Sequence, residues 1–186
     1  MSSRQEKAAR TRADLLEAAT VVFAHKGYLN TTINDITDEA GRAAGSFYNH
    51  FDSKESLLLA LAEEIGEDAD VLITEATGDL ADIEPHLEVF WQLQSRHRAV
   101  IAALREAALV NPDFAAGMRD YWAEQLEPWV ELFAAARDNG AQLPGTPEFT
   151  AQLVADLATA FVAGWEGADR DGLAALTTFV ERALGG

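Results

Sequence analysis

Apolar residues recur every three or four positions along nearly the whole chain, and this period constrains its fold more than any other feature of the sequence. Residues with that spacing share one face of a helix. The first such face, which ends before Gly27, consists of Leu15, Ala18, Ala19, Val22 and Phe23. No segment shows the alternating β-branched pattern that is typical of a strand. The sequence therefore predicts an all-α fold.

Two short helices joined by a tight turn follow this first helix. They are expected over residues 32–40 and 44–51, on either side of a turn at residues 41–43. Thr32 can cap the earlier helix, with Asp35 three positions later in the place of a capping-box acid. This spacing is typical of a helix-turn-helix, whose second helix enters the major groove of DNA.

The helical period continues through a fourth helix, which Asp52 or Ser53 caps, and through a larger C-terminal set. The C-terminal helices are expected at about 83–95, 97–110, 113–139, 147–166 and 171–184. Breaks are expected at Gly78, Asn111-Pro112, Gly140, Leu143-Pro144-Gly145 and residues 169–172. Pro128 lies inside the segment 113–139, where it should kink the helix or open it locally. The chain is thus expected to have about nine helices.

The formal net charge of −17 is concentrated in the C-terminal part of the chain. Residues 1–54 hold seven Lys or Arg and seven Asp or Glu, and four of these cations lie in the first 12 residues. Residues 55–186 hold seven cations and 24 acids. Binding to a phosphate backbone needs cations, so this asymmetry suggests that one chain carries two separate roles.

Several classes of protein are excluded by what the sequence lacks. No apolar run reaches the roughly 18–20 residues of a membrane span, and the N-terminus has no signal-peptide pattern, so we expect a cytoplasmic protein without a membrane partner. The absence of cysteine excludes disulfides, thiolate nucleophiles and cysteine-ligated metals. The four histidines show no metal-binding spacing, and neither a glycine-rich phosphate loop nor a nucleophile elbow is present. We therefore expect no cofactor and no enzymatic activity.

The N-terminal region also carries the residues, and not only the spacing, of a known DNA-binding domain. Residues 31–41 read Thr-Thr-Ile-Asn-Asp-Ile-Thr-Asp-Glu-Ala-Gly, and residues 45–57 read Gly-Ser-Phe-Tyr-Asn-His-Phe-Asp-Ser-Lys-Glu-Ser-Leu. With the pair Gly27-Tyr28, they resemble the DNA-binding domain of the TetR (tetracycline-repressor) family over roughly residues 11–60. The resemblance implies an N-terminal arm and helix-turn-helix domain over 1–54 and a ligand-binding and dimerisation domain over 55–186.

The resemblance also implies a set of DNA contacts. Phosphate contacts are expected from Thr32, Tyr48, His50 and Lys54. The residues expected to face base edges are Asn34, Ala44, Gly45, Ser46 and Asn49. Phe47 and Phe51 are expected in the core that holds the second helix. Two alternatives stay open, since Thr32 could serve only as a helix cap and Tyr48 could pack in the core.

The sequence departs from the family's pattern at three positions. Ala44 stands where Lys or Arg is usual, Arg42 where an apolar residue is usual, and Asp52 where a base is common. Fewer cations displace fewer counterions, which flattens the salt dependence of DNA binding. Arg42 is therefore expected to compensate as a DNA contact, together with the N-terminal cations Arg4, Lys7, Arg10 and Arg12.

All four tryptophans lie in the C-terminal part, where they could line an apolar ligand cavity or pack a core or dimer interface. The residues expected nearest to a ligand are Phe90, Met118, Tyr121, Trp122, Phe133, Phe161 and Trp165. Asp156 interrupts an apolar run, either as a ligand anchor or on an exposed or interface edge of its helix. An acidic, aromatic domain favours lipophilic neutral or cationic effectors over anionic ones.

The resemblance thus implies a homodimeric, ligand-responsive repressor that binds a palindromic operator and is released by a small lipophilic molecule. Apolar stripes on the last two helices are expected to pair with their copies in a two-fold interface. These stripes are Leu153, Leu157, Phe161 and Gly164, then Leu173, Leu176, Val180, Ala183 and Leu184. The alternative is a ligand-binding helical dimer without specific DNA binding, which Ala44 and Asp52 make conceivable.

Overall fold

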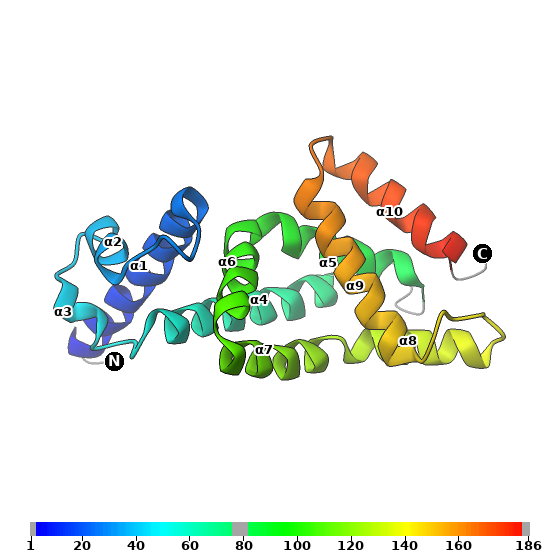
Figure 1. Cartoon of the computed structure of the whole chain (residues 1–186), viewed down its shortest axis with the longest axis horizontal. Helices are drawn as coiled ribbons and strands as arrows, with labels where there is room; N and C mark the ends of the chain where they lie inside the picture. Colours follow the sequence, from blue (N-terminus) through cyan, green and yellow to red (C-terminus); the bar gives the residue numbers. More distant parts are fainter. Residues whose placement is uncertain (1–2, 76–81, 184–186) are drawn as a thin grey trace. The chain divides into compact units, whose positions relative to one another are not determined.

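The structure of the protein is a computed structural model that describes residues 3–75 and 82–183. These residues form ten α-helices and no strand, which confirms the all-α fold (Figure 1). The predicted break at Gly78 and the stripe residue Leu184 lie outside the described residues. The helices are α1 (Ser3–Lys26), α2 (Ile33–Glu39), α3 (Ala44–Phe47), α4 (Lys54–Glu75), α5 (Ile83–Arg96), α6 (Arg98–Val110), α7 (Pro112–Gln125), α8 (Glu127–Asp138), α9 (Pro147–Gly164) and α10 (Asp169–Ala183).

The chain divides into two compact units. The first contains residues 1–65 and 97–118, and the second contains residues 66–96 and 119–186. α6 therefore packs with the N-terminal helices, although it follows α5 of the second unit directly in the chain. The functional boundary expected between residues 54 and 55 stays a prediction.

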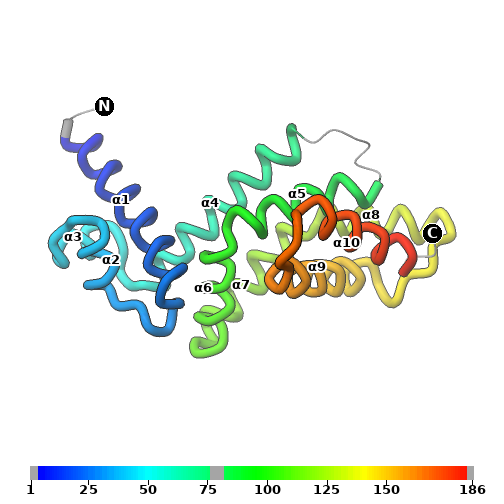
Figure 2. Tube along the Cα trace, turned by 90° about the horizontal axis from the view of Figure 1, so that it is seen from above, coloured from blue at the N-terminus to red at the C-terminus, as the bar shows by residue number. Residues whose placement is uncertain are grey.

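The first unit is built around α1, which packs against α2 and α6 (Figure 2). Leu15, Ile36, Phe47 and Leu57 are completely buried in this unit. The ring centroid of Phe47 lies 5.6 Å from that of Phe51, which is also buried, so the expected core positions of both residues are confirmed. Burial of these side chains anchors α3 to the helices around it.

The predicted helix over 113–139 is two helices in the structure, which is why there are ten and not about nine. α7 ends at Gln125, and α8 begins at Glu127 with Pro128 in its first turn. Proline lacks an N–H group and fits the first turn of a helix, where that group needs no partner. The local opening expected at Pro128 is confirmed. Among the described helices, none is long and apolar enough to cross a membrane.

α3 is shorter than the predicted helix over 44–51. The Phe47 carbonyl accepts the N–H groups of both His50 and Phe51, at 2.9 and 3.0 Å. This shared acceptor tightens the chain after Phe47 into a turn. Tyr48 and the two residues after it therefore lie just beyond the helix end.

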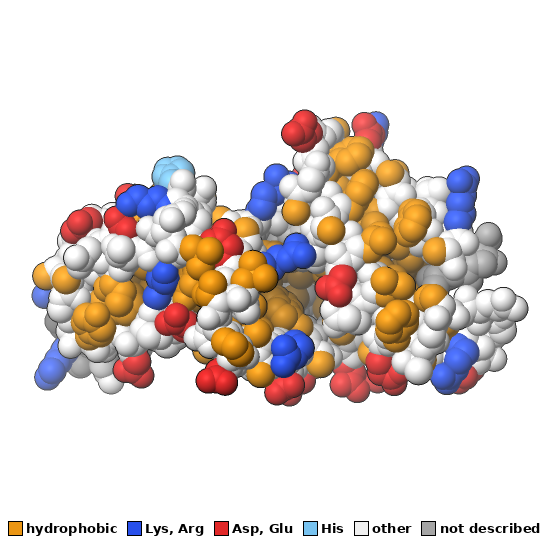
Figure 3. Space-filling model, viewed as in Figure 1, with side chains coloured by type: hydrophobic (Ala, Val, Ile, Leu, Met, Phe, Trp, Pro, Cys, Tyr) orange, Lys and Arg blue, Asp and Glu red, His pale blue; other side chains and the backbone are white. Residues whose placement is uncertain are grey.

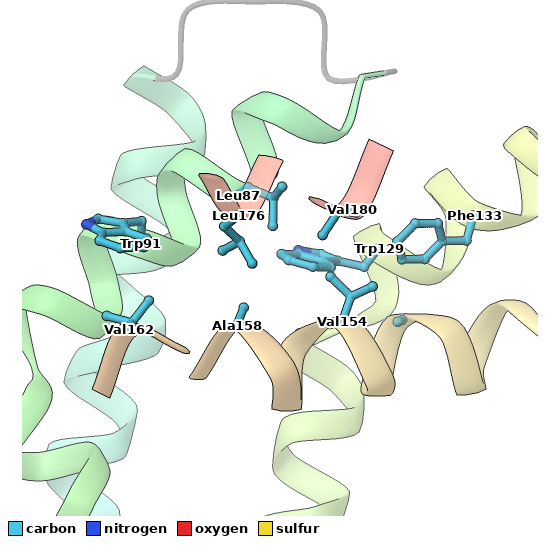
Figure 4. Close-up of a cluster of buried hydrophobic side chains, with 10 residues drawn as sticks. Leu87, Trp91, Trp129, Phe133, Val154, Ala158, Val162, Leu176 and Val180 are labelled. Carbon is cyan, nitrogen blue, oxygen red and sulfur yellow. The ribbon is translucent and has the colours of Figure 1, made fainter. Parts of the chain in front are cut away.

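The second unit packs α5, α8, α9 and α10 around a core of large apolar side chains (Figure 4). Its buried residues are Leu87, Trp91, Trp129, Phe133, Ala151, Val154, Ala158, Val162, Leu176 and Val180. α10 approaches α5 closely at Gly172, where a Cβ would collide with the Trp91 ring.

One expectation about α10 is wrong. Leu176 and Val180 were expected to face a second copy of the chain, but both side chains point into the core of their own unit (Figure 4). The large apolar side chain that α10 exposes is Phe179, at 55%. A helical period shows which residues share a face, and here that face covers Leu87 and Trp91 of the same chain.

Candidate functional site

The helix-turn-helix begins at a complete N-terminal cap on α2. Thr32 Oγ1 accepts a hydrogen bond from the Asp35 backbone N–H at 3.2 Å, and Asp35 Oδ2 accepts one from the Thr32 N–H at 2.9 Å. The Thr32 hydroxyl also donates to Asp35 Oδ2 at 2.8 Å. This capping box confirms the predicted helix start and gives Thr32 its role as a cap, while its phosphate contact stays a prediction.

The cap depends on the charge of Asp35. A hydrogen bond from Lys26 at 2.5 Å, with further hydrogen bonds from Thr32, lowers the pKa of Asp35 from 3.8 to about 2. Because the folded-state pKa is the depressed one, the stability from this charge is fully present above about pH 4 and is lost as the pH falls toward 2. We expect the α2 amides to lose protection, measured as their exchange rate relative to that of an unfolded chain, over this window. The loss should follow the titration of the Asp35 carboxyl, which NMR can monitor.

Asp35→Asn is the matched control for this prediction. The variant keeps the shape of the side chain but has no carboxyl group, so the change in α2 exchange between pH 4 and 2 should disappear. An Asp35 carboxyl that titrates at its ordinary pKa would contradict the prediction.

The second helix of the motif presents an open surface. Ala44 and Gly45 are exposed, and no atom lies within 4 Å of the position that a Cβ would take on Gly45. The side chain of Tyr48 is 62% exposed, and Asn49 beside it is exposed as well. The exposure of Tyr48 excludes the alternative that it packs in the core. α3 and the turn after it are therefore free to meet a partner.

The structure brings all ten predicted DNA-contacting residues into the first unit. Asn34 is exposed on α2, and Ser46 and His50 are half-buried. The Ser46 hydroxyl donates to the Ala43 carbonyl at 2.8 Å, and the His50 ring lies 6.5 Å from that of Phe51. These side chains stay predicted contacts.

Arg42 forms an ion pair within the protein. Its guanidinium contacts Asp14 of α1, and its backbone N–H donates to the Thr37 carbonyl at 2.8 Å. The side chains of Arg42 and Asp14 are each about one-third exposed. The pair therefore links the turn of the motif to α1 and remains accessible to solvent. Sequence reasoning missed Asp14, because no local pattern links residues 28 positions apart. The DNA contact of Arg42 stays a prediction.

Lys54 also has partners within the protein. Its ammonium group donates to the carbonyls of Tyr28 and Thr31, both at 2.7 Å, and lies 3.9 Å from the centroid of the Tyr28 ring. Burial lowers the pKa of Lys54, while the negative charges of Glu55 and Glu106 act in the opposite direction. Lys54 therefore holds the loop between α1 and α2, and its phosphate contact stays a prediction.

The N-terminal cations lie on the first turns of α1, not on an extended arm. They are all exposed: Arg4, Lys7, Arg10 and Arg12. The guanidinium carbon of Arg12 lies 5.4 Å from the centroid of the Phe51 ring. Four exposed cations on one helix beside the motif provide positive charge near α3.

The residues predicted near a ligand divide between the two units. Met118 is buried in the first unit, and the other seven belong to the second. Phe161 lies 5.2 Å from Trp165 and 6.1 Å from Trp91, measured between ring centroids. Trp91 is buried, and its Nε1 has no hydrogen-bond partner in the part of the chain that the structure describes. Sequence reasoning did not single out Trp91, because its position in the helical period marks it only as a core residue.

The other candidates lie around Trp129 and on α7 and α9. Phe133 is buried, and its ring centroid lies 6.4 Å from that of Trp129. The ring centroid of Phe90, on α5, lies 5.5 Å from that of Trp129. Tyr121 and Trp122 are half-buried neighbours. Asp156 is exposed on α9, which agrees with the alternative that it lies on an exposed or interface edge of its helix. In the described ranges, no group of three His, Asp or Glu side chains could hold a metal ion.

Comparison with known proteins gives related sequences for both parts of the chain. Residues 15–61 match the family described as bacterial regulatory proteins, tetR family. The HTH-type transcriptional repressor DhaR of Mycobacterium sp. strain GP1 is 31% identical over 165 residues, which cover 84% of this chain and 79% of DhaR. The HTH-type transcriptional regulator EthR of Mycolicibacterium smegmatis is 28% identical over 152 residues, covering 74% of this chain and 68% of EthR.

Solved structures show the same fold. A bacterial regulatory protein of the tetR family from Rhodococcus RHA1 superposes with a TM-score of 0.79 at 23% identity, covering 100% of this chain and 98% of that one. The fatty acid degradation regulator FadR of Bacillus halodurans superposes with a TM-score of 0.73 at 22% identity, covering 95% of each chain.

Proposed function

Because this chain belongs to the TetR family of bacterial transcriptional regulators, we propose that it binds a palindromic operator as a homodimer and leaves it when a small lipophilic molecule binds. The observation that carries the proposal is the open surface of α3. Phe47 is buried and fixes the helix, while Ala44, Gly45, Tyr48 and Asn49 are left exposed. A recognition helix needs this combination of a rigid anchor and a free outer face.

Each exposed group has chemistry that suits DNA. Asn34 and Asn49 carry amides that can pair with an adenine edge through two hydrogen bonds, and Gly45 permits close approach of the backbone. The Tyr48 hydroxyl can donate to a phosphate, as can His50 and Lys54. The Thr32 hydroxyl would do so by turning away from Asp35 Oδ2, to which it donates in the capping box. The cations at the start of α1 add an attraction that does not depend on sequence.

The exposed apolar face of α9 supports the homodimer. Leu153 and Leu157 are 42% and 39% exposed, and Phe149 precedes them on the same helix. Figure 3 shows hydrophobic side chains gathered over α9 and α10. A palindromic operator requires a two-fold symmetric protein, and an isologous contact of this face with its copy would cover these residues. Asp156 lies at the edge of this face, where water or a cation of the partner can solvate it.

The aromatic cluster of Trp91, Phe161 and Trp165 supports an effector site in the second unit. These rings offer apolar surface. The Trp91 Nε1–H, which has no partner among the described residues, can donate to an acceptor atom of a ligand. We retain the preference for neutral or cationic lipophiles, since the second unit carries most of the acidic residues. We propose that the protein acts on chromosomal DNA in the cytoplasm, by binding and not by catalysis.

The alternative, a ligand-binding dimer without specific DNA binding, is not favoured. The relatives reported above are helix-turn-helix regulators, and Ala44, Gly45, Tyr48 and Asn49 are exposed in the first unit. The decisive experiment is selection of duplexes from a randomised pool by the purified protein. Enrichment of a palindrome supports the proposal, whereas retention of random duplexes alone, with affinity set only by salt, would overturn it.

Tyr48 gives a specific prediction for the selected duplex. Tyr48→Phe removes only the hydroxyl, and we expect at least roughly tenfold weaker binding to all sequences, because a hydrogen bond to a charged phosphate contributes on the order of 1.5–3 kcal/mol. The salt slope should not change, since no cation is lost. Fluorescence anisotropy across a salt series measures both quantities. Leu109→Ala is the control, because Leu109 on α6 is 82% exposed and belongs to neither the predicted DNA contacts nor the α9 face, so its truncation should leave DNA affinity unchanged. Equal losses in both variants would remove Tyr48 from the interface.

A further inference from the structure

The loop over residues 27–31 connects α1 to the capped start of α2. Gly27 ends α1 with φ at +71°, a conformation that favours glycine. Within the loop, the Thr31 hydroxyl donates to the Gly27 carbonyl at 2.7 Å, and the Thr31 N–H donates to the Tyr28 carbonyl at 3.2 Å. Thr32, the next residue, is the N-cap of α2, so the position of this loop sets the position of the helix-turn-helix.

α4 holds the carbonyl side of the loop. The Lys54 ammonium group binds the carbonyls of Tyr28 and Thr31, and the Tyr28 hydroxyl donates to Glu55 Oε1 at 2.7 Å. Burial, with this hydrogen bond and the charge of Glu55, raises the pKa of the Tyr28 hydroxyl, which therefore remains a donor at all physiological pH values.

α6 holds the other side of the loop through Glu106. Glu106 Oε2 accepts a hydrogen bond from the Leu29 backbone N–H at 3.1 Å. Both carboxylate oxygens lie 3.1 Å from the position that a Cβ would take on Gly27, so the carboxylate approaches the loop backbone directly. The apolar face of α6, with Val100, Ala103 and Leu104 buried, packs in the same unit and keeps Glu106 at this distance.

We propose that Glu106 is a positioning residue through which α6 holds the 27–31 loop, and with it the helix-turn-helix, in the arrangement that binds the operator. The proposal rests on the proposed function and names the residue that would carry its regulation. In the chain, only His97 separates α6 from α5 of the second unit, so in this proposal a displacement of α5 would move α6. Moving α6 would then withdraw Glu106 from the Leu29 N–H.

An effect of charge alone would change DNA affinity in the opposite direction, so the test can distinguish it from a positioning role. Removing a negative charge from the DNA-binding unit should strengthen its attraction to phosphates. If Glu106 positions the loop, its removal should weaken binding to the operator despite the more favourable charge. The sign of the effect therefore separates the two roles.

The test compares Glu106→Gln and Glu106→Ala with Glu63→Gln in the full-length protein. Glu63 is an exposed acid on α4 in the same unit, so its substitution makes the same change in charge. Binding is measured on the duplex that the wild-type protein selects, and exchange of the Leu29 amide is measured by NMR without DNA. We expect about tenfold weaker binding for Glu106→Ala, a smaller loss for Glu106→Gln, and no loss for Glu63→Gln. Leu29 exchange should accelerate only in the Glu106 variants.

Equal or tighter operator binding by both Glu106 variants would overturn the proposal, as would unchanged Leu29 exchange. An equal loss in Glu63→Gln would overturn it too, because the loss would then not depend on the contact between Glu106 and the loop. Glu106→Gln keeps the side-chain shape, so it provides the binding measurement if Glu106→Ala does not fold. If the wild-type protein selects no duplex, the proposed function fails, while the Leu29 exchange still decides whether Glu106 holds the loop.

Discussion

In sedimentation experiments at micromolar concentration, a protein carrying both Leu153→Glu and Leu157→Glu will be a monomer, whereas the wild-type protein will be a dimer. Both leucines lie on the exposed apolar face of α9. In an isologous interface each substitution occurs twice, so four carboxylates would be buried among apolar side chains without partners. We expect operator affinity to fall by at least about a hundredfold, since linking two half-site contacts typically raises affinity by 10² to 10⁴.

Gln152→Glu is the control for this experiment. Gln152 is an exposed polar residue on the same helix, and its substitution adds a carboxylate beside the apolar face without altering that face. The variant should remain a dimer with wild-type operator affinity. A dimer that persists in the double leucine variant would show that the two-fold contact uses another surface.

Phe47→Ala will produce the largest loss of stability in the DNA-binding unit. Phe47 is 0% exposed, and its ring packs 5.6 Å from Phe51 and 5.5 Å from Tyr48. Truncation of a buried phenylalanine typically costs about 3–5 kcal/mol, a large part of the total stability of a domain. Because Phe47 links α3 to the core, we expect specific DNA binding to be lost at temperatures where the wild-type protein still binds.

The distribution of tryptophans allows this loss to be assigned to one unit. All four tryptophans lie in the second unit, so their fluorescence reports unfolding of that unit, whereas far-UV circular dichroism reports both. In urea, Phe47→Ala should lower the circular dichroism midpoint more than the fluorescence midpoint. Leu109→Ala, which truncates a side chain that is 82% exposed on α6, should change neither. Wild-type midpoints by both methods in Phe47→Ala would contradict the prediction.

The features predicted correctly from sequence depend on residues close together in the chain. The helical period, the Thr32–Asp35 capping box and the opening at Pro128 all involve neighbours within about one helical turn. Phe47 and Phe51 are buried as expected, although Phe51 lies beyond the end of α3. The resemblance to the family likewise rests on a contiguous stretch, so it predicts the DNA-binding candidates without the tertiary fold.

Only the tertiary structure determined which side chains contact partners that lie far away in the sequence. Arg42 forms an ion pair with Asp14, and the Lys54 ammonium group donates a hydrogen bond to the carbonyl of Tyr28. Glu106 accepts a hydrogen bond from a backbone N–H 77 residues away. A helical pattern shows which residues share a face, but it does not show which element covers that face. For that reason the sequence could not reveal that Leu176 turns into its own core, or that a carboxylate of α6 reaches the loop before the helix-turn-helix.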